Sequence, residues 1–289
     1  MTDPEALTIS TQTLVKESFH THPRYFPFFM IGISFVQGCL TILVSGTLLA
    51  LLFSYDPQRR HELWRYLTVM LVHAGPRHLL PNVAFQIMLG VILEIEHNSK
   101  RIAIVYLASV LGGSLFNTVL TPKKYAVGAS AAVYGLFFSH LATILLNWNV
   151  VDKKWFRIML LTLFISFDIA SSLYYEIFLN VNLHVRPITE SNRSQSASRS
   201  VVSYAGHLGG ALTGFLVSFL ALKKFEDNRW QETLQIVCIG LLSAGFIFIL
   251  LFNICTPNLY LPTEWNFEYS ESLKNYSRKF LKGEVLIRM

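Results

Sequence analysis

The chain has 289 residues, of which 52% are hydrophobic and only 15% are charged. Soluble domains carry about 25% charged residues, so this composition excludes an ordinary soluble domain and indicates a membrane protein. The net charge of +6 does not indicate nucleic-acid binding, because the basic residues lie in ones and twos between apolar segments. The three cysteines offer neither a disulfide framework nor the paired spacing of a metal site.

Seven segments are long and apolar enough to cross a membrane, for which a helix needs about 20 predominantly apolar residues. In chain order they cover residues 26–54, 78–96, 101–121, 130–148, 157–179, 203–222 and 233–254. The pattern predicts an all-α, polytopic membrane protein. Residues 1–25 form a polar amino-terminal segment that lacks the apolar core of a signal peptide.

The segments between the predicted spans divide the chain further. Residues 55–77 mix short apolar pieces with charges, and we expect a folded first loop at the membrane interface, a level that suits Trp64. We expect six spans and this loop to form one unit over residues 26–222. A loop and the seventh span follow over 223–254, and residues 255–289 form a polar carboxyl-terminal tail.

Two N-x-S/T sequons, at Asn192 and Asn275, bear on the orientation of the chain. With seven spans, both lie on the membrane face opposite the amino terminus. Glycosylation requires that face to be lumenal. We therefore expect a cytosolic amino terminus and a place in the secretory pathway, at the Golgi, endosome or plasma membrane. The Lys and Arg residues of the loops do not decide the orientation.

Four polar residues stand out within the predicted spans, because polar side chains are costly inside a bilayer. His78 and Asn82 lie early in the second span, Ser130 begins the fourth, and His207 lies early in the sixth. These three spans run in the same direction, and a helix rises 1.5 Å per residue, so all four residues lie near one membrane face. A receptor or transporter would spread its polar residues through the depth of the membrane, so the clustering disfavours both.

Small residues indicate that the fourth and sixth spans pack closely. Gly206, Gly210 and Gly214 repeat at four-residue spacing, and Ala131 and Gly135 repeat likewise in the fourth span. Helices in such contact can bring a serine and a histidine within hydrogen-bonding distance. The alternative interpretation is a packing seam with a buried structural histidine.

Several motifs between residues 60 and 222 resemble those of the rhomboid intramembrane serine proteases. In chain order they are Trp64-Arg65, the H-x4-H-x3-N spacing of His73, His78 and Asn82, Glu94 after a Leu-Gly pair, GASAAVYGL from Gly128, and AGHLGGALTGF from Ala205. The combination is specific, although each motif alone is weak. One position departs from the family pattern, because Ala131 stands where the family usually has glycine after the serine.

The resemblance implies a six-helix rhomboid core followed by a carboxyl-terminal seventh transmembrane helix, as in the eukaryotic secretase-type branch. It also implies that Ser130 is the nucleophile and His207 its general base, and that the Tyr134 ring stacks on the imidazole. The residues implied to support the oxyanion are His78, Asn82 and Gly128. The residues implied to give structural support are Trp64, Arg65, His73 and Glu94.

Two of these supporting residues carry specific expectations. Arg65 is expected to bond backbone carbonyls or lipid headgroups and so to anchor the first loop. Glu94 is expected to tie the same region together.

On this resemblance the chain is expected to be a serine endopeptidase that cleaves single-span membrane proteins within or near their transmembrane segment and releases ectodomains. Its partners would be these substrates and membrane lipids, without nucleic acid, metal or organic cofactor. The alternative is a catalytically weak or inactive relative that binds membrane clients and controls their trafficking or degradation. The presence of both Ser130 and His207 argues against this alternative.

Overall fold

The computed structural model describes residues 24–166, 170, 203–225 and 228–256. Within these ranges the regular structure is helical, and β pairing is limited to an isolated antiparallel bridge between Tyr55 and Ala126. Residues 154–166 form a helical stretch. The other elements are α2 (Phe28–Leu43), α3 (Gly46–Phe53), η1 (Pro57–Arg59), α4 (Arg65–Thr68), η2 (Val69–Leu71), α5 (Pro76–His97), α6 (Ser99–Leu120), α7 (Ser130–Leu146), α10 (Tyr204–Ala221) and α11 (Arg229–Cys255).

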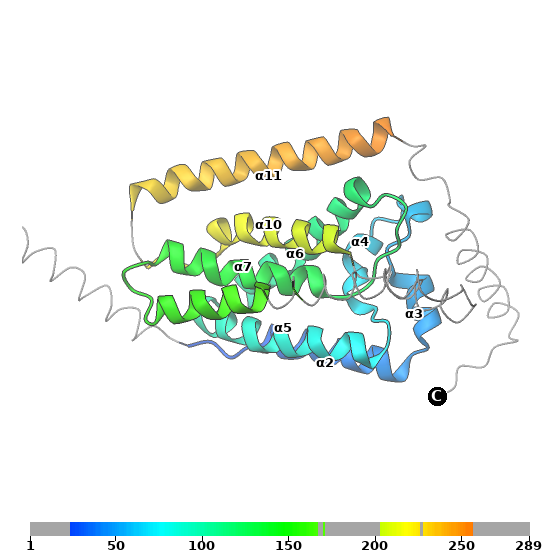
Figure 1. Ribbon diagram of the computed structural model, residues 1–289, viewed down its shortest axis with the longest axis horizontal. Coiled ribbons are helices and arrows are strands. Elements are labelled where there is room, and N and C mark those ends of the chain that lie inside the picture. Colours follow the sequence, from blue (N-terminus) through cyan, green and yellow to red (C-terminus); the bar gives the residue numbers. More distant parts are fainter. Residues whose placement is uncertain (1–23, 167–169, 171–202, 226–227, 257–289) are drawn as a thin grey trace, which may run out of the picture.

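Four of the described helices could cross a membrane by length and composition, namely α5, α6, α10 and α11, whereas α2 and α7 are apolar but shorter. The axes of these helices are roughly parallel to one another (Figure 1). Large apolar side chains such as Phe35, Ile104 and Phe246 are exposed on their outer faces. An apolar exterior of this extent requires a bilayer, so the chain is a multi-pass membrane protein. The predicted span over 157–179 lies partly outside the described residues.

The first predicted span, 26–54, is not one helix. α2 ends at Leu43, Val44 adopts an extended conformation, and α3 begins only at Gly46. The break falls on a β-branched residue followed by serine and glycine, all of which weaken a helix. The folded first loop therefore includes α3 and starts at Val44, rather than at residue 55 as the hydropathy pattern predicts.

Glycines allow α10 to lie directly against the backbone of α7. A Cβ built on Gly210 would lie 2.2 Å from the Ala131 carbonyl oxygen, and one built on Gly214 would lie 2.5 Å from the Gly135 Cα. These separations leave no room for a side chain, so the predicted small-residue contact between the two helices is confirmed. The contact places the first turns of α7 and α10 side by side.

Replacing Gly210 by alanine is expected to destabilise the protein by about 1–3 kcal/mol, because the new methyl group would overlap the Ala131 carbonyl. Gly240→Ala on α11 is the matched control. Nothing lies within 4 Å of a Cβ at that position, and alanine favours a helix over glycine. Thermal unfolding in detergent micelles measures the difference. Equal melting temperatures for the two variants would contradict the prediction.

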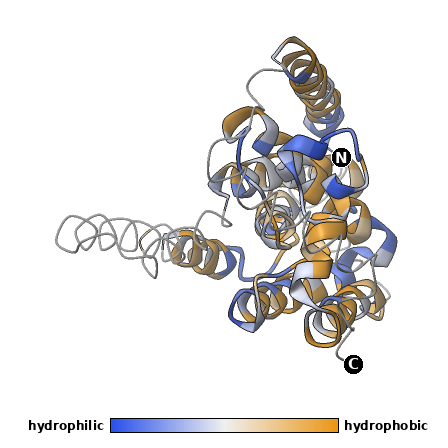
Figure 2. Ribbon diagram, turned by 90° about the vertical axis from the view of Figure 1, so that its right-hand side faces the viewer, coloured by the Kyte–Doolittle hydropathy of each residue, from blue (hydrophilic) through white to orange (hydrophobic). Residues whose placement is uncertain are grey.

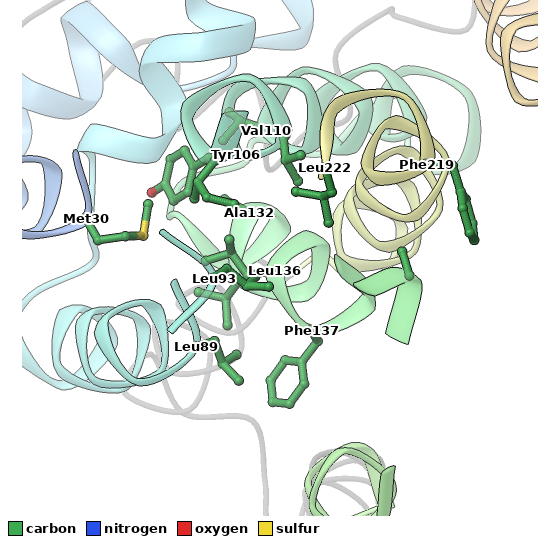
Figure 3. Close-up of a cluster of buried hydrophobic side chains, with 14 of the residues drawn as sticks. Met30, Leu89, Leu93, Tyr106, Val110, Ala132, Leu136, Phe137, Phe219 and Leu222 are labelled. Carbon is green, nitrogen blue, oxygen red and sulfur yellow. The ribbon is translucent and has the colours of Figure 1, made fainter. Parts of the chain in front are cut away.

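A buried apolar cluster joins α2, α5, α6, α7 and α10 (Figure 3). Leu93 of α5, Tyr106 of α6 and Leu136 of α7 are fully buried in it. Leu89 and Phe137 lie on the side of the cluster away from α6 (Figure 3). The cluster makes α5, α6 and α7 a common scaffold for residues at their ends.

A polar network inside the bundle connects α2, α5 and α6. Gln86 Nε2 donates to Ser34 Oγ at 2.6 Å and to Gln37 Oε1 at 3.1 Å, while the Tyr106 hydroxyl donates to Gln86 Oε1 at 2.6 Å. Gln37 Nε2 donates to the Met70 carbonyl of η2 at 3.1 Å. Buried polar groups need such partners, and this set attaches the first loop to the membrane helices.

α11 lies at the edge of the bundle and is apolar over most of its length (Figure 2). Polar contacts hold it near its two ends. Gln231 Nε2 donates to the Leu146 carbonyl at 2.8 Å, and Asn253 Nδ2 donates to Thr118 Oγ1 at 2.8 Å. Arg60 of the first loop donates to the Asn253 carbonyl at 3.3 Å. α11 thus contacts the first loop.

Candidate active site

The predicted serine and histidine meet between two helix starts. Ser130 is the first residue of α7, and His207 lies in the first turn of α10. Ser130 Oγ and His207 Nε2 are 2.8 Å apart, which is a hydrogen bond. A serine hydroxyl is a weak nucleophile until a base accepts its proton, and this separation meets that requirement.

Two tyrosine rings flank the His207 imidazole. The Tyr134 ring stacks on it with centroids 4.4 Å apart and an interplanar angle of 17°. The Tyr204 ring meets it edge-on, at 6.2 Å and 85°. The sequence pointed to Tyr134 and missed Tyr204, although residues three apart on a helix are neighbours. The two rings together restrict the orientation of the imidazole.

The chain enters α7 through a turn that favours glycine. Gly128 has a φ of +110°, in a region that L side chains rarely adopt, and its N–H donates to the Val69 carbonyl at 3.0 Å. A Cβ built there would lie 2.8 Å from His78 Cε1 and 3.1 Å from Nε2. Glycine at this position lets the His78 imidazole lie against the backbone two residues before Ser130.

His78 and Asn82 stand on the first two turns of α5. The Ala74 N–H donates to His78 Nδ1 at 3.4 Å, so the proton of a neutral imidazole lies on Nε2. That nitrogen faces the Gly128 turn and can donate into the site. Asn82 Nδ2 donates to the His78 carbonyl at 2.8 Å. The same amide carries a second N–H that this bond does not use.

His73 packs behind His78 with ring centroids 5.5 Å apart. It is 4% exposed, and neither ring nitrogen has a hydrogen-bond partner within the described part of the chain. Burial, and to a smaller extent the neighbouring His78, lower the pKa of His73 to about 3. His73 is therefore neutral at neutral pH and supports His78 by packing.

His73 should make the protein less stable in acid. Its pKa falls from 6.5 to about 3 on folding, so between these values the unfolded chain binds a proton that the folded chain does not. The contribution of neutral His73 to the free energy of unfolding is fully present above pH 6.5. It decreases as the pH falls, by up to about 1.4 kcal/mol per pH unit. Thermal unfolding of His73→Leu should show a shallower acid slope than wild type. His61→Leu, which removes an exposed histidine of the same loop, should keep the wild-type slope, and equal slopes for both variants would contradict the prediction.

Arg65 fastens the first loop from inside. Its side chain is 2% exposed, Nη1 donates to the Ser54 carbonyl at 3.0 Å, and Nη2 donates to the Leu51 carbonyl at 2.8 Å. Nε pairs with Glu62 at 2.7 Å. Of the two acceptors expected for Arg65, backbone carbonyls and lipid headgroups, the structure contains the carbonyls. Trp64 is 54% exposed, as suits an interfacial residue.

Glu62 is a supporting residue that the sequence reasoning missed. Its carboxylate pairs with Arg65 at 2.7 Å and with Arg59 at 2.6 Å. Burial alone would raise the pKa of Glu62, but hydrogen bonds from the two arginines hold that pKa below its ordinary value. The available signal was its spacing of three residues from each arginine.

Glu94 gives structural support, but at a different place from the one expected. Its carboxylate accepts the N–H groups of Phe29 and Met30, both at 2.8 Å, and so caps the start of α2. Glu94 lies twelve residues after Asn82 on α5, which is about 18 Å along a helix. It therefore lies toward the opposite end of α5 from His78 and does not tie the first loop.

Ala131, the departure from the family pattern, is accommodated by a glycine on α6. A Cβ built on Gly113 would lie 2.5 Å from the Ala131 Cβ, so the absence of a side chain at Gly113 provides the space for the Ala131 methyl group.

Within the described ranges, no group of three or more His, Cys, Asp and Glu residues is placed to hold a metal ion. The sequon residues Asn192 and Asn275 lie outside the described residues.

A family model for the Rhomboid domain matches residues 60–224, which is more than half of the chain. The chain is 33% identical over 217 residues to Rhomboid-related protein 1 from Caenorhabditis elegans, an alignment that covers 75% of this chain and 56% of that protein. It is 30% identical over 203 residues to Rhomboid-related protein 2 from Mus musculus, covering 70% of this chain and 62% of that protein.

A third relative carries a different description. The chain is 29% identical over 198 residues to Inactive rhomboid-related protein 2 from Caenorhabditis elegans, covering 68% of this chain and 51% of that protein. The chain thus spans between 51% and 62% of the length of these three relatives.

Proposed function

Because the chain belongs to the rhomboid family, we propose that it is an intramembrane serine endopeptidase. The observation that carries the proposal is the 2.8 Å contact between Ser130 Oγ and His207 Nε2, with the Tyr134 ring stacked on the imidazole. The reaction needs a nucleophile, a base and an oriented imidazole in one place, and these residues supply all three.

The proposed architecture is a six-span rhomboid core over residues 26–222 with a carboxyl-terminal seventh transmembrane helix. Five of the six core spans are α2, α5, α6, α7 and α10. The segment 157–179 provides the remaining span, which comes between α7 and α10 in the chain. The seventh span, α11, lies within the unit 223–254. A polar segment precedes the core over residues 1–25, and a tail follows over 255–289.

Catalysis proceeds through an acyl-enzyme. Ser130 Oγ attacks the carbonyl carbon of the scissile peptide bond while His207 Nε2 takes the hydroxyl proton. His207 then gives this proton to the leaving amine nitrogen, the C–N bond breaks, and an ester remains on Ser130. Water attacks the ester with His207 as base again, which releases a carboxylic acid and restores the serine. Ser130 and His207 form a dyad in this scheme.

The charge that develops on the carbonyl oxygen is stabilised by nearby donors. The Ser130 backbone N–H lies at the positive end of α7, and the His78 Nε2 proton and the Asn82 amide come from α5. The Gly128 turn places His78 against this backbone. Each such donor contributes about 10²–10³-fold in rate.

Tyr134 acts as a positioning residue in this mechanism. Tyr134→Ala is expected to lower kcat by about 10²-fold, because a poorly oriented imidazole transfers its proton inefficiently. Tyr134→Phe keeps the stacked ring and should retain most of the activity. Cleavage rates at saturating substrate measure the difference, and equal losses in both variants would show that the hydroxyl, rather than the ring, matters.

The proposed substrates are single-span membrane proteins, cut within or near their transmembrane segment so that an ectodomain is released. Ser130 lies at the start of α7 and thus near a membrane face, where water can reach it. With a cytosolic amino terminus this face is lumenal or extracellular. The corresponding location is the secretory pathway, at the Golgi, endosome or plasma membrane.

A second candidate function is binding of membrane clients without cleavage, with effects on their trafficking or degradation. Two observations favour this second function. One is the similarity to the relative named Inactive rhomboid-related protein 2, and the other is the departure from the family pattern at Ala131. The paired Ser130 and His207 favour the protease.

A fluorophosphonate probe together with a single-span reporter distinguishes the two functions. For the protease, the purified chain in liposomes should react with the probe at Ser130 and cleave the reporter. A folded chain that neither reacts with the probe nor cleaves the reporter, but still co-purifies with it, would support client binding instead.

A further inference from the structure

A cavity of about 750 Å³ lies between α5, α7 and the helical stretch 154–166. Binding sites for small molecules have volumes of about 300–1,000 Å³, so this one is large enough for a ligand. Its apolar wall includes Met88, Leu89, Ile92, Phe137, Leu160 and Phe164. Leu89 and Phe137 lie at one margin of the buried cluster in Figure 3.

The cavity is separate from the candidate active site. His140, which lines it, lies ten residues after Ser130 on α7, or about 15 Å along the helix. His140 Nε2 is bonded to the Leu89 carbonyl at 3.1 Å, so this histidine holds the wall together. The cavity therefore lies toward the membrane face opposite Ser130.

The apolar part of the cavity opens toward the surroundings. Met88 is 51% exposed, Ile92 44%, Leu160 46% and Leu163 63%, and all four line it. In a membrane protein, an apolar opening on the outside of transmembrane helices faces hydrocarbon chains. The material that can enter from that side is lipid or another membrane-embedded segment.

The far end of the cavity carries charge. Asp152, Lys153 and Arg157 line it, and Arg157 Nη2 pairs with Glu96 Oε1 at 3.0 Å. Arg157 Nη1 is buried and has no hydrogen-bond partner within the described part of the chain, and the same holds for the second oxygen of its ion-pair partner, Glu96 Oε2. The Arg157 side chain as a whole is 28% exposed, so the guanidinium can also donate to an acceptor from outside the protein.

Two tryptophans indicate the depth of this charged end in the membrane. Trp148 and Trp155 contact each other with ring centroids 5.6 Å apart, beside Lys153 and Arg157 in the chain. Tryptophans concentrate at the headgroup level of a bilayer. The Arg157 guanidinium therefore lies at the depth of lipid phosphates, next to an opening for an acyl chain.

We propose that this cavity binds one anionic phospholipid, with an acyl chain along α5 and its phosphate at the Arg157 guanidinium and near Lys153. A guanidinium favours phosphate because its fork matches the oxygens. The leaflet opposite Ser130 is cytosolic in the proposed orientation, where anionic lipids concentrate. Only that leaflet assignment rests on the proposed function.

The test uses the full chain in phosphatidylcholine vesicles that contain a photoactivatable lipid, either phosphatidylglycerol or phosphatidylcholine, with the reactive group in the acyl chain. Mass spectrometry then locates the labelled residues. Labelling should fall on the segments 88–92 and 156–164, and phosphatidylglycerol should label about five-fold more than phosphatidylcholine, as one added cationic contact predicts. Ser130→Ala should label like wild type, which separates this result from the fate of the proposed protease activity.

Three charge variants and one steric variant identify the contacts. Arg157→Gln should abolish the phosphatidylglycerol preference. Glu96→Gln breaks the same ion pair but keeps the cation, so it should preserve or increase the preference. Lys124→Gln removes an exposed cation in the segment just before α7 and should behave like wild type. Leu160→Trp should reduce labelling by both lipids, because the larger side chain fills the cavity.

Equal labelling by the two lipids in wild type would overturn the proposal, as would equal results for Arg157→Gln and Lys124→Gln. Loss of the preference in both Arg157→Gln and Glu96→Gln would assign the effect to the ion pair rather than to lipid. If a single-span reporter displaced the lipid label and the cavity residues cross-linked to that reporter, the cavity would be a substrate route instead.

Discussion

Replacing Ser130 by alanine is expected to lower kcat/KM for a single-span reporter by about four to six orders of magnitude, and replacing His207 by alanine should have a similar effect. The two residues act as a unit, because the hydroxyl is reactive only when the imidazole 2.8 Å away accepts its proton. The double variant should therefore lose hardly more than either single one. Quantified reporter cleavage in liposomes, with matched protein amounts, measures all three.

The chain offers close controls for this experiment. Ser139 is buried on the same helix, and its hydroxyl donates to the Gly135 carbonyl at 2.7 Å, so Ser139→Ala should leave cleavage within a few-fold of wild type. His61 is exposed, and His61→Ala serves the same purpose for the histidine. If Ser130→Ala cleaved the reporter at the wild-type rate, another group would be the nucleophile.

The candidate site could be located from the sequence because membrane topology adds constraints that soluble proteins lack. Span parity put Ser130 and His207 near one face, and the four-residue spacing of Gly206, Gly210 and Gly214 predicted the close helix contact. The structure contains that contact and a hydrogen bond between the two side chains. The stacked position of the Tyr134 ring followed from the resemblance to the rhomboid proteases, and the structure contains that stacking.

Other features depend on information that hydropathy does not contain. The break after Leu43 leaves the segment 26–54 apolar throughout, so a composition window cannot detect it. The Glu94 carboxylate meets the start of α2, a contact between residues 64 and 65 positions apart. Polar groups find such partners through tertiary structure, and residue spacing within one helix does not predict them.

Replacing Arg65 by methionine is expected to destabilise the first loop by about 3–5 kcal/mol, because it breaks a buried ion pair. The change would leave Glu62, whose side chain is only 12% exposed, with its other ion pair to Arg59 alone. It would also remove the donors from the Leu51 and Ser54 carbonyls at the end of α3, where a cation is favourable. Thermal unfolding and limited proteolysis of the loop measure the effect.

The graded variant Arg65→Lys separates charge from geometry. A lysine supplies a cation but not the planar fork that reaches Glu62 and two carbonyls at once, so its loss of stability should be intermediate. Arg77→Met, which removes an exposed arginine at the start of α5, is the control. If Arg65→Met melted at the temperature of Arg77→Met, the loop would be held by other contacts, such as the Gln37 bond to Met70. If the prediction holds, cleavage should fall in parallel, because the same loop supplies Val69, whose carbonyl holds the Gly128 turn beside Ser130.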